Sequence, residues 1–257
     1  MGTAQPAREE ALAPVRVSRR GGSSPYVLVC DHASNFIPDR FGTLGLDCSE
    51  LTRHIAWDPG ALPVASRMAE ALDATLIESC VSRLVIDCNR PLDAPDLISP
   101  VSEATAVPGN ADLSESARQE RISASWQPFH DAIADVVTGR LAEGRETRLV
   151  SVHSFTPVYK GVDRPWHIGI IHDEDDGLAR PMITALRGVV GLEVGVNQPY
   201  SPADRVYYTL ERHGRARDLA CAMIEIRNNE ITDEPAQRRW AELLSAILAG
   251  VGPAGRR

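Results

Sequence analysis

The stretch VLVCDHASNFIP, residues 27–38, joins an apolar run to an abrupt polar turn. A short apolar run rich in β-branched residues is typical of a strand that is buried on both faces. The run stops at Asp31 and His32, and Pro38 follows in the turn. Ligands of open α/β sheets bind beyond the carboxyl ends of the strands. We therefore expect Tyr26–Cys30 to form a buried strand whose end brings an acid and an imidazole to a binding site.

Similar apolar runs alternate with helical periodicity along the rest of the chain. Further strands are predicted at residues 75–77, 84–88, 149–153, 166–171 and 219–226. Helices are predicted in two pieces over 48–71, over 113–143 with a kink at Pro128, and over 181–190 and 234–248. Strands separated by helical crossovers favour an α/β fold of three layers, with a mostly parallel or mixed central sheet and helices on both faces.

The length of 257 residues, of which 43% are hydrophobic and 24% charged, suits one large domain. We assign this single α/β domain to residues 25–252. Residues 1–24 lack the apolar segment of a secretory signal and are expected to form a flexible leader. Residues 91–112 are rich in Pro, Asp and Ser, and they predict a long loop of the kind that is usually functional or mobile.

Charge and composition narrow the classes of partner. The net charge is −8 and no Lys/Arg cluster is present, which argues against nucleic acid as a ligand. No apolar run approaches the roughly 18 residues that a bilayer span requires, so no membrane segment is expected. The five cysteines lack CxxC spacing and favour a reduced, cytoplasmic protein. Composition leaves open whether the chain forms a homo-oligomer.

Two histidines lie where predicted strands end. His32 and His153 could supply two imidazoles to one divalent cation, for which Zn²⁺ is the expected metal. Asp58 is the preferred third ligand, with His54 of the same segment RHIAWDPG as a substitute. Two alternatives stay open: each histidine is an ordinary hydrogen-bonded residue, or Asp58 is the N-cap of a helix whose first turn contains Pro59.

At these residues the chain resembles the N-formylglutamate amidohydrolase family, in particular its amidohydrolase-like branch. The resemblance covers most of the chain, from about residue 26 to 232, and is carried in order by VCDHASNFIP, HIAWDPGA, SRLVIDCNRP, WQPFHDAI, VHSFTP, NQPYS, YYTLERHG and IEIRNNEI. It implies an α/β fold similar to zinc-dependent exopeptidases such as carboxypeptidases and aspartoacylase. The exopeptidase Glu ligand after the first His is Asn35 here, so that metal sphere does not transfer directly.

The wider resemblance implies roles for two arginines. IDCNRP is similar to the Asn-Arg element with which aspartoacylase-type enzymes hold a substrate carboxylate, so Asn89 and Arg90 would bind a carboxylate. Arg83 resembles the arginine that those enzymes direct at the scissile carbonyl, where it would stabilise an oxyanion. The alternative for both arginines is a surface ion pair with Asp87 or Asp93.

Glu225, in CAMIEIR, matches the family acid near the end of the last strand. Burial raises the pKa of a carboxyl group, and that environment suits a general base. A structural ion pair of Glu225 with Arg227 or Arg205 is the alternative. His213, in YYTLERHG, matches a family histidine and would bind substrate, whereas His130 is expected to pack within its helix.

Together these features predict a metal-dependent hydrolase that cleaves the linear amide of an N-formyl or other short N-acyl amino acid, such as N-formylglutamate. The substrate would be a small molecule with a free carboxylate, and Glu225 and Arg83 would be catalytic. One alternative is a carboxypeptidase-like or N-acetyl or N-succinyl amino-acid hydrolase. The other is a catalytically silent relative that binds carboxylates through Arg83 and Arg90.

Overall fold

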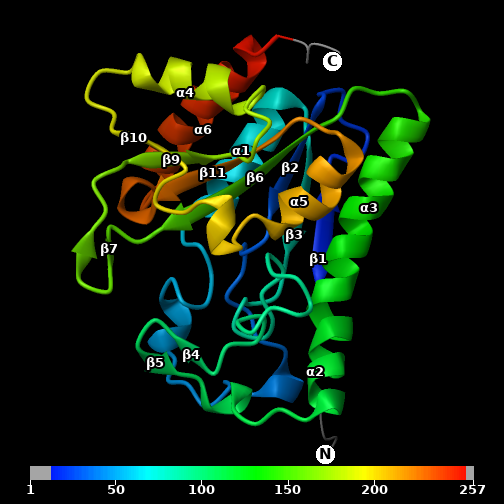
Figure 1. Cartoon of the computed structure of the whole chain (residues 1–257), viewed down its shortest axis with the longest axis vertical. Helices are drawn as coiled ribbons and strands as arrows, with labels where there is room; N and C mark the ends of the chain where they lie inside the picture. The colour runs from blue at the N-terminus through cyan, green and yellow to red at the C-terminus, as the bar shows by residue number, and fades with distance from the viewer. Residues whose placement is uncertain (1–12, 253–257) are drawn as a thin grey trace, which may run out of the picture.

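A seven-stranded mixed sheet forms the centre of the protein (Figure 1). The structure is a computed structural model and describes residues 13–252 of the chain. The four middle strands run parallel to one another. At one edge a single strand pairs with them in the antiparallel direction. At the other edge two strands, which are parallel to each other, are antiparallel to the middle four. In order across the sheet, the strands are β1 (Val15–Ser18), β3 (Thr75–Ser79), β2 (Tyr26–Cys30), β6 (Arg148–Phe155), β11 (Cys221–Arg227), β9 (Ile168–Ile171) and β10 (Val194–Val196).

Helices cover both faces of the sheet, which confirms the predicted three-layer α/β fold (Figure 1). Successive side chains of β2 alternate between the two layers, with Leu28 in one core and Val27 and Val29 in the other. Both faces of this strand are therefore buried, and its sequence is continuously apolar. One face packs against α1 (Ala61–Leu72), α4 (Ala179–Arg187) and α6 (Glu234–Gly250), and the other against α3 (Gln127–Ala142) and α5 (Tyr208–His213).

The long helical pattern over residues 113–143 forms one continuous helical column in Figure 1. It consists of α2 (Glu115–Arg121), a π-helical turn (Ile122–Trp126) and α3. Pro128 lies just after the π-helical turn. A proline inside a helix has no N–H to donate and clashes with the carbonyl four residues earlier, which belongs to Ala124 in that turn. The irregularity therefore falls where the sequence predicted a kink.

The predicted strand over residues 84–88 is wrong. This segment forms successive turns, closed by backbone hydrogen bonds from Val85 N–H to the carbonyl of Ser82 and from Arg90 N–H to that of Asp87. Leu84, Val85 and Ile86 belong to a third core outside the sheet, which includes Trp126, and Cys88 belongs to the core next to α3. A short apolar run does not distinguish a buried strand from a buried turn, and here tertiary packing decides.

Three further differences concern shorter elements. Val15–Ser18, which the sequence placed in the flexible leader, is paired with β3 as strand β1; residues 1–12 of that leader lie outside the described residues. The first helical piece expected over 48–71 is only a short 3₁₀ helix, Glu50–Thr52. Strand β10 and helix α5 were not predicted, because both are short and contain little periodic signal.

A region of loops and short hairpins lies beyond the carboxyl ends of β2 and β6. It contains the predicted loop over 91–112, with a small hairpin of β4 (Val101–Ser102) and β5 (Thr105–Ala106) (Figure 1). A second hairpin, of β7 (Val158–Tyr159) and β8 (Val162–Asp163), follows β6. All five cysteines are free. Within residues 13–252, no helix combines the length and apolar composition that a bilayer span requires.

Candidate functional site

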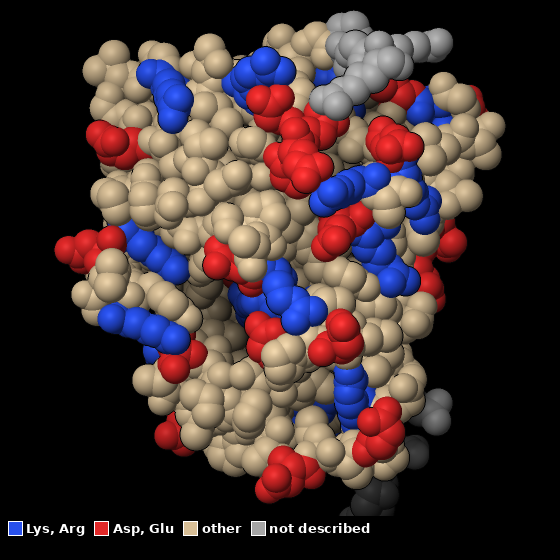
Figure 2. Space-filling view, in the orientation of Figure 1, with Lys and Arg blue, Asp and Glu red and all other residues tan. Residues whose placement is uncertain are grey.

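A cavity of about 240 Å³ lies at the carboxyl ends of β2, β6 and β11. Figure 2 shows a hollow on this face of the molecule, with basic and acidic side chains next to each other at its rim. His32, His153 and Glu225 meet here from the ends of β2, β6 and β11, and the segment over 84–90 reaches the cavity from turns. The lining includes His32, His54, Asp58, Arg83, Asp87, Asn89, Arg90, His153, Tyr159, Tyr200 and Glu225.

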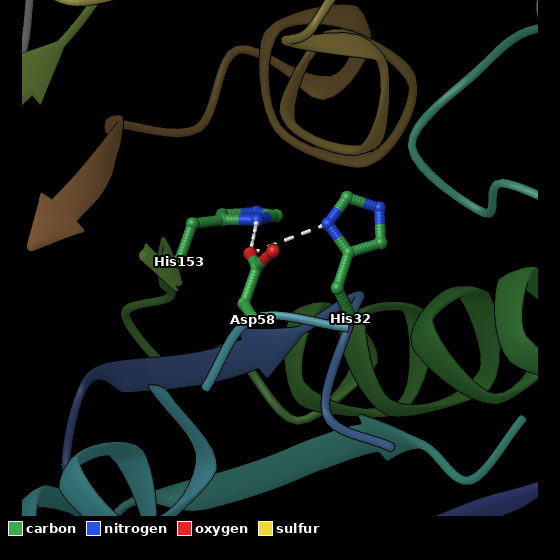
Figure 3. A group of neighbouring side chains, drawn as sticks. All are labelled: His32, Asp58 and His153. Carbon is green, nitrogen blue, oxygen red and sulfur yellow. Dashed lines mark hydrogen bonds and ion pairs between the residues drawn. The ribbon is translucent and has the colours of Figure 1, made fainter. Parts of the chain in front are cut away.

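Asp58 links the two strand-end histidines (Figure 3). Its Oδ2 atom lies 2.9 Å from Nδ1 of His153 and 3.3 Å from Nδ1 of His32. The ring centroids of the two histidines are 5.0 Å apart, and one ligand atom from each of the three side chains lies within 4.8 Å of the other two. All three side chains are buried. The structure thus brings together the three residues that the sequence predicted as metal ligands.

Asp58 does not cap a helix. Helix α1 begins at Ala61, and its N-cap is Gly60, which has a φ of 82°. No described side chain forms a capping hydrogen bond at this end of the helix. The backbone N–H of Asp58 instead donates to the carbonyl of His32 at 3.0 Å, which fixes the acid beside the first histidine. The substitute ligand His54 directs Nε2 at the carbonyl of Ser154, so this nitrogen acts as a donor.

A second acid contacts the far nitrogen of each histidine. Nε2 of His32 lies 2.7 Å from Oδ1 of Asp87, and Nε2 of His153 lies 3.0 Å from Oδ2 of Asp31. The other oxygen of Asp31 accepts the hydroxyl hydrogen of Thr209. Carboxylates in this position select the tautomer and orient the ring. They leave both Nδ1 atoms directed toward Asp58, in the arrangement of metal-binding histidines.

The electrostatics of the triad favour positive charge at its centre. Burial lowers the pKa of His153, yet the carboxylates of Asp31 and Asp58 outweigh it and raise this pKa well above its ordinary value. Burial and Arg83 lower the pKa of His32, but its two acids again raise it overall. Burial raises the pKa of Asp58, while the imidazoles hold it well below its usual range. Protons or a metal ion can supply the charge.

The donor set fits a divalent cation. Two imidazole nitrogens and one carboxylate oxygen form a common ligand set of catalytic zinc sites, which keep another position for water or substrate. Oδ1 of Asp58 is buried and has no hydrogen-bond partner among the described residues, so the carboxylate retains an acceptor. His32, Asp58 and His153 can therefore hold such an ion, with Asp87 and Asp31 as the outer acids.

Glu225 lies beside this triad. On neighbouring parallel strands it is in register with His153, and its buried Oε2 atom has no hydrogen-bond partner in the described part of the chain. Burial raises the pKa of Glu225 to about 7, against the opposing effect of His153. The alternative of a structural ion pair is wrong, because its two expected partners form other pairs, Arg227–Glu230 and Arg205–Asp93.

Arg83 connects the acids of the cavity. One terminal nitrogen lies 2.6 Å from Oδ2 of Asp87 and the other 3.6 Å from Oδ1 of Asp58. The ion pair with Asp87, which the sequence offered as an alternative, is therefore present. It lies in the cavity wall, and the arginine side chain is only 21% exposed. The pair thus belongs to the site and is not a surface contact.

Asn89 and Arg90 differ in what they can offer a substrate. The Asn89 side chain accepts from Thr209 N–H at 3.0 Å and donates to the carbonyl of Val206, so it fastens the start of α5. Arg90 donates from Nε to Asp96 at 2.8 Å, and neither of its expected acids, Asp87 or Asp93, forms this pair. Arg90 also lines the cavity, whereas the amide of Asn89 is already engaged.

His213 does not line the cavity. Its ring stacks on His130 at 5.1 Å between centroids, and its Nε2 lies 2.8 Å from Nδ1 of His130. Nε2 of His130 donates to the carbonyl of Cys88, so its Nδ1 must accept from His213. The structure therefore does not place His213 where it would contact a substrate in this cavity. His130 packs against Trp126, as a helix-packing histidine would.

The buried histidine pair predicts a pH-dependent stability. Burial lowers the pKa of His130 to about 4 and that of His213 to about 3, below the unfolded value of about 6.5. The unfolded state then binds more protons as the pH falls below 6.5, so the pair destabilises the fold between pH 7 and 5, by about 1–2 kcal/mol per histidine. Urea unfolding at pH 7 and pH 5 measures the effect. The free energy of unfolding should fall less between these pH values for His213→Gln than for the wild type. Equal losses would contradict this account.

Three residues of the site were given no specific role by the sequence, although Asp31 was expected near it. Asp31 and Asp87 act through the histidine rings, and a weak signal for Asp31 is its place directly before His32. Tyr200, in NQPYS, lines the cavity and accepts a hydrogen bond from Arg164 at 3.1 Å. Burial raises the pKa of Tyr200 to about 12, so its hydroxyl keeps a hydrogen that it can donate into the cavity.

Comparison with known proteins identifies relatives over most of the chain. A model of the N-formylglutamate amidohydrolase family matches residues 24–232. The solved structure of gene product Atu2144 from Agrobacterium tumefaciens is similar, with 43% sequence identity and a TM-score of 0.90, over 93% of this chain and 94% of that one. N-formylglutamate amidohydrolase from Ralstonia eutropha JMP134 shares the fold, with 20% identity and a TM-score of 0.69, over 92% of this chain and 96% of that one. A search of curated proteins finds no match.

Proposed function

The chain belongs to the N-formylglutamate amidohydrolase family, and from this premise we propose that it is a metal-dependent hydrolase of small N-acyl amino acids. The bond cleaved would be the linear amide of an N-formyl group, as in N-formylglutamate. One observation supports this proposal above all others. His32, Asp58 and His153 converge at the cavity, and beside them lies Glu225, whose buried Oε2 atom has no hydrogen-bond partner among residues 13–252.

In this proposal His32, Asp58 and His153 hold a divalent cation, with Zn²⁺ as the expected metal. When bound, such a cation lowers the pKa of a water molecule and polarises a carbonyl group. Asp87 and Asp31 would orient the two imidazoles through their Nε2 atoms, which leaves both Nδ1 atoms on the side of Asp58 as the donors to the cation. This orientation limits the motion of the rings and reduces the reorganisation needed on binding.

Glu225 is the proposed general base and acid. Its carboxylate takes a proton from the attacking water and returns it to the nitrogen of the leaving amino acid. A pKa near 7 suits both steps, since a group with this pKa gains and loses a proton readily near neutral pH. Its buried, unpaired Oε2 atom has no competing hydrogen bond within the described residues.

Two arginines are the proposed contacts for substrate oxygens. Arg83 would stabilise the negative charge that develops on the carbonyl oxygen, and its place next to Asp58 supports this role. Arg90 would bind the α-carboxylate of the amino acid, since it lines the same cavity. Asn89 then acts indirectly, by holding the start of α5 against the cavity wall.

Metal content combined with a substrate panel tests this proposal. We expect the purified chain to hold one divalent metal and to release formate from N-formyl-L-glutamate. Chelation should abolish turnover, and adding the metal back should restore it. Equal kcat/KM for N-formyl-L-glutamate and its α-amide would remove Arg90 as an α-carboxylate contact.

The same measurements separate the alternatives. Hydrolysis of N-acetyl or N-succinyl amino acids in preference to the formyl compounds would identify a different acyl group. A metal-free protein without turnover that still binds carboxylates would identify a silent relative and contradict the proposed function.

A further inference from the structure

The two outer acids of the histidine triad are connected to each other through the start of α5. Asp31 accepts the hydroxyl hydrogen of Thr209, the second residue of this helix. The backbone N–H of Thr209 donates to Oδ1 of Asn89 at 3.0 Å, and the backbone N–H of Asn89 donates to Oδ1 of Asp87 at 2.9 Å. A path of hydrogen bonds therefore joins Asp31 to Asp87 through two residues that are not proposed ligands of the cation.

The triad closes this path into a ring. Each of the two histidines faces its outer acid with Nε2 and faces Asp58 with Nδ1. Both imidazoles thus belong to one ring of polar contacts, in which Thr209 and Asn89 lie opposite Asp58. All members of the ring are buried. Polar contacts are stronger in such surroundings than in water, so a ring of this kind holds its members in defined positions.

The hydroxyl of Thr209 is the anchor of Asp31. It holds Oδ1 of this acid, and the other oxygen, Oδ2, faces Nε2 of His153 at 3.0 Å. Within residues 13–252, the Asp31 carboxylate has no hydrogen-bond partner besides these two contacts. Thr209 is completely buried, so water does not compete for its hydroxyl. The position of the carboxylate, and with it the orientation of the His153 ring, therefore depends on this one hydroxyl.

The second outer acid, Asp87, has more support. It accepts from Arg83 at 2.6 Å and from the backbone N–H of Asn89 at 2.9 Å, so the loss of one contact leaves the other. A backbone N–H is also not removed by a change of side chain. Thr209 is therefore the member of the ring in which the loss of one group loosens an outer acid.

We propose that Thr209 is a positioning residue of the metal centre: its hydroxyl holds Asp31, and through Asp31 it holds His153 in the orientation that binds the cation. Hydrogen-bond partners of a ligating histidine fix its tautomer and ring orientation, and they tune the affinity for the metal. Thr209 acts one contact further from the cation than such a partner. The inference rests on the proposed function for the presence of the cation, but it concerns how tightly the cation is bound and not which amide is cleaved.

The zinc affinity of conservative variants tests this role. Thr209→Val keeps the shape of the side chain and removes the hydroxyl. Competition for Zn²⁺ between the zinc-loaded protein and a chromophoric chelator should show a dissociation constant about 10-fold higher than that of the wild type. Thr209→Ser, which retains the hydroxyl, should restore the dissociation constant to within about threefold of the wild type. An unchanged dissociation constant in Thr209→Val would overturn the proposal.

Thr75→Val is the matched control for the loss of a buried threonine hydroxyl. Thr75 is also completely buried, and its hydroxyl donates to the carbonyl of Arg19 at 3.1 Å. It begins β3, which is parallel to β2, so it lies at the end of the sheet opposite the cavity. We expect this control to unfold at a lower temperature and to bind Zn²⁺ as the wild type does. A loss of zinc affinity equal to that of Thr209→Val would indicate a general loss of stability and overturn the proposal.

A double-mutant cycle tests whether Thr209 acts through Asp31. Asp31→Ala removes the carboxylate that the hydroxyl holds, and it should raise the dissociation constant for Zn²⁺ by about 10- to 100-fold. Adding Thr209→Val to this variant should change the constant by less than about twofold, because no carboxylate is left to position. A further loss of about 10-fold in the double variant would assign the effect of Thr209 to another contact and overturn the proposal.

The same variants separate failure of this inference from failure of the proposed function, because zinc affinity is measured without hydrolysis. If the zinc affinity depends on the Thr209 hydroxyl but no formate is released from N-formyl amino acids, the proposed function fails and the inference stands. If formate is released and the wild type and Thr209→Val bind Zn²⁺ equally tightly, the inference fails and the proposed function stands.

Discussion

Asp58→Asn should eliminate tight metal binding and lower kcat/KM by about a thousandfold or more. The substitution retains the size of the side chain but removes the negative charge that both imidazoles face at 2.9 and 3.3 Å. A cation at this position would lose its only carboxylate ligand, and several kcal/mol of transition-state stabilisation would be lost with it. Elemental analysis and formate release measure the two effects.

The matched control for this variant is Asp176→Asn. Asp176 lies on the surface next to α4, where it pairs with Arg180, and it undergoes the same chemical change far from the triad. We expect full metal content and activity in this control. An Asp58→Asn protein with one bound metal and wild-type turnover would remove the triad from the mechanism.

Glu225→Gln should lower kcat by about 10²- to 10⁴-fold, the usual contribution of a general acid or base. KM and metal content should change little, since Glu225 is not one of the three proposed ligands. The midpoint of thermal unfolding should stay the same or rise. Burial raises the pKa of Glu225 to about 7, which means that the folded protein disfavours its charged form, and glutamine has no charge to bury.

The combination of lost turnover and retained stability is the diagnostic result for Glu225. A destabilised and inactive variant would instead indicate a structural acid. Glu242→Gln, on the exposed side of α6, is the control for the same change without a functional role. Turnover by Glu225→Gln within threefold of the wild type would contradict the proposed general base.

Much of the architecture could be predicted from local sequence patterns. The central strands β2, β6 and β11 have apolar runs that are buried on both faces, and such runs are recognisable without tertiary information. The error at residues 84–88 has the same origin, because a buried turn in the third core has the same apolar composition as a strand. Edge strand β1 has no strong pattern, and its pairing with β3 depends on a partner some 60 residues later in the chain.

The sequence by itself determined which chemical groups are brought to the carboxyl ends of the strands, because a strand's length and direction decide where its polar end emerges. This reasoning yielded His32, His153 and Glu225. Only the tertiary structure decided which hydrogen-bond or ion-pair partner the nitrogen and oxygen atoms of each group have. Asp58 faces two imidazoles and caps no helix, Asn89 is fastened to the start of α5, and His213 turns toward His130. The physical reason is that hydrogen bonds and ion pairs depend on distances of about 3 Å between residues far apart in the chain, and no local pattern encodes those distances.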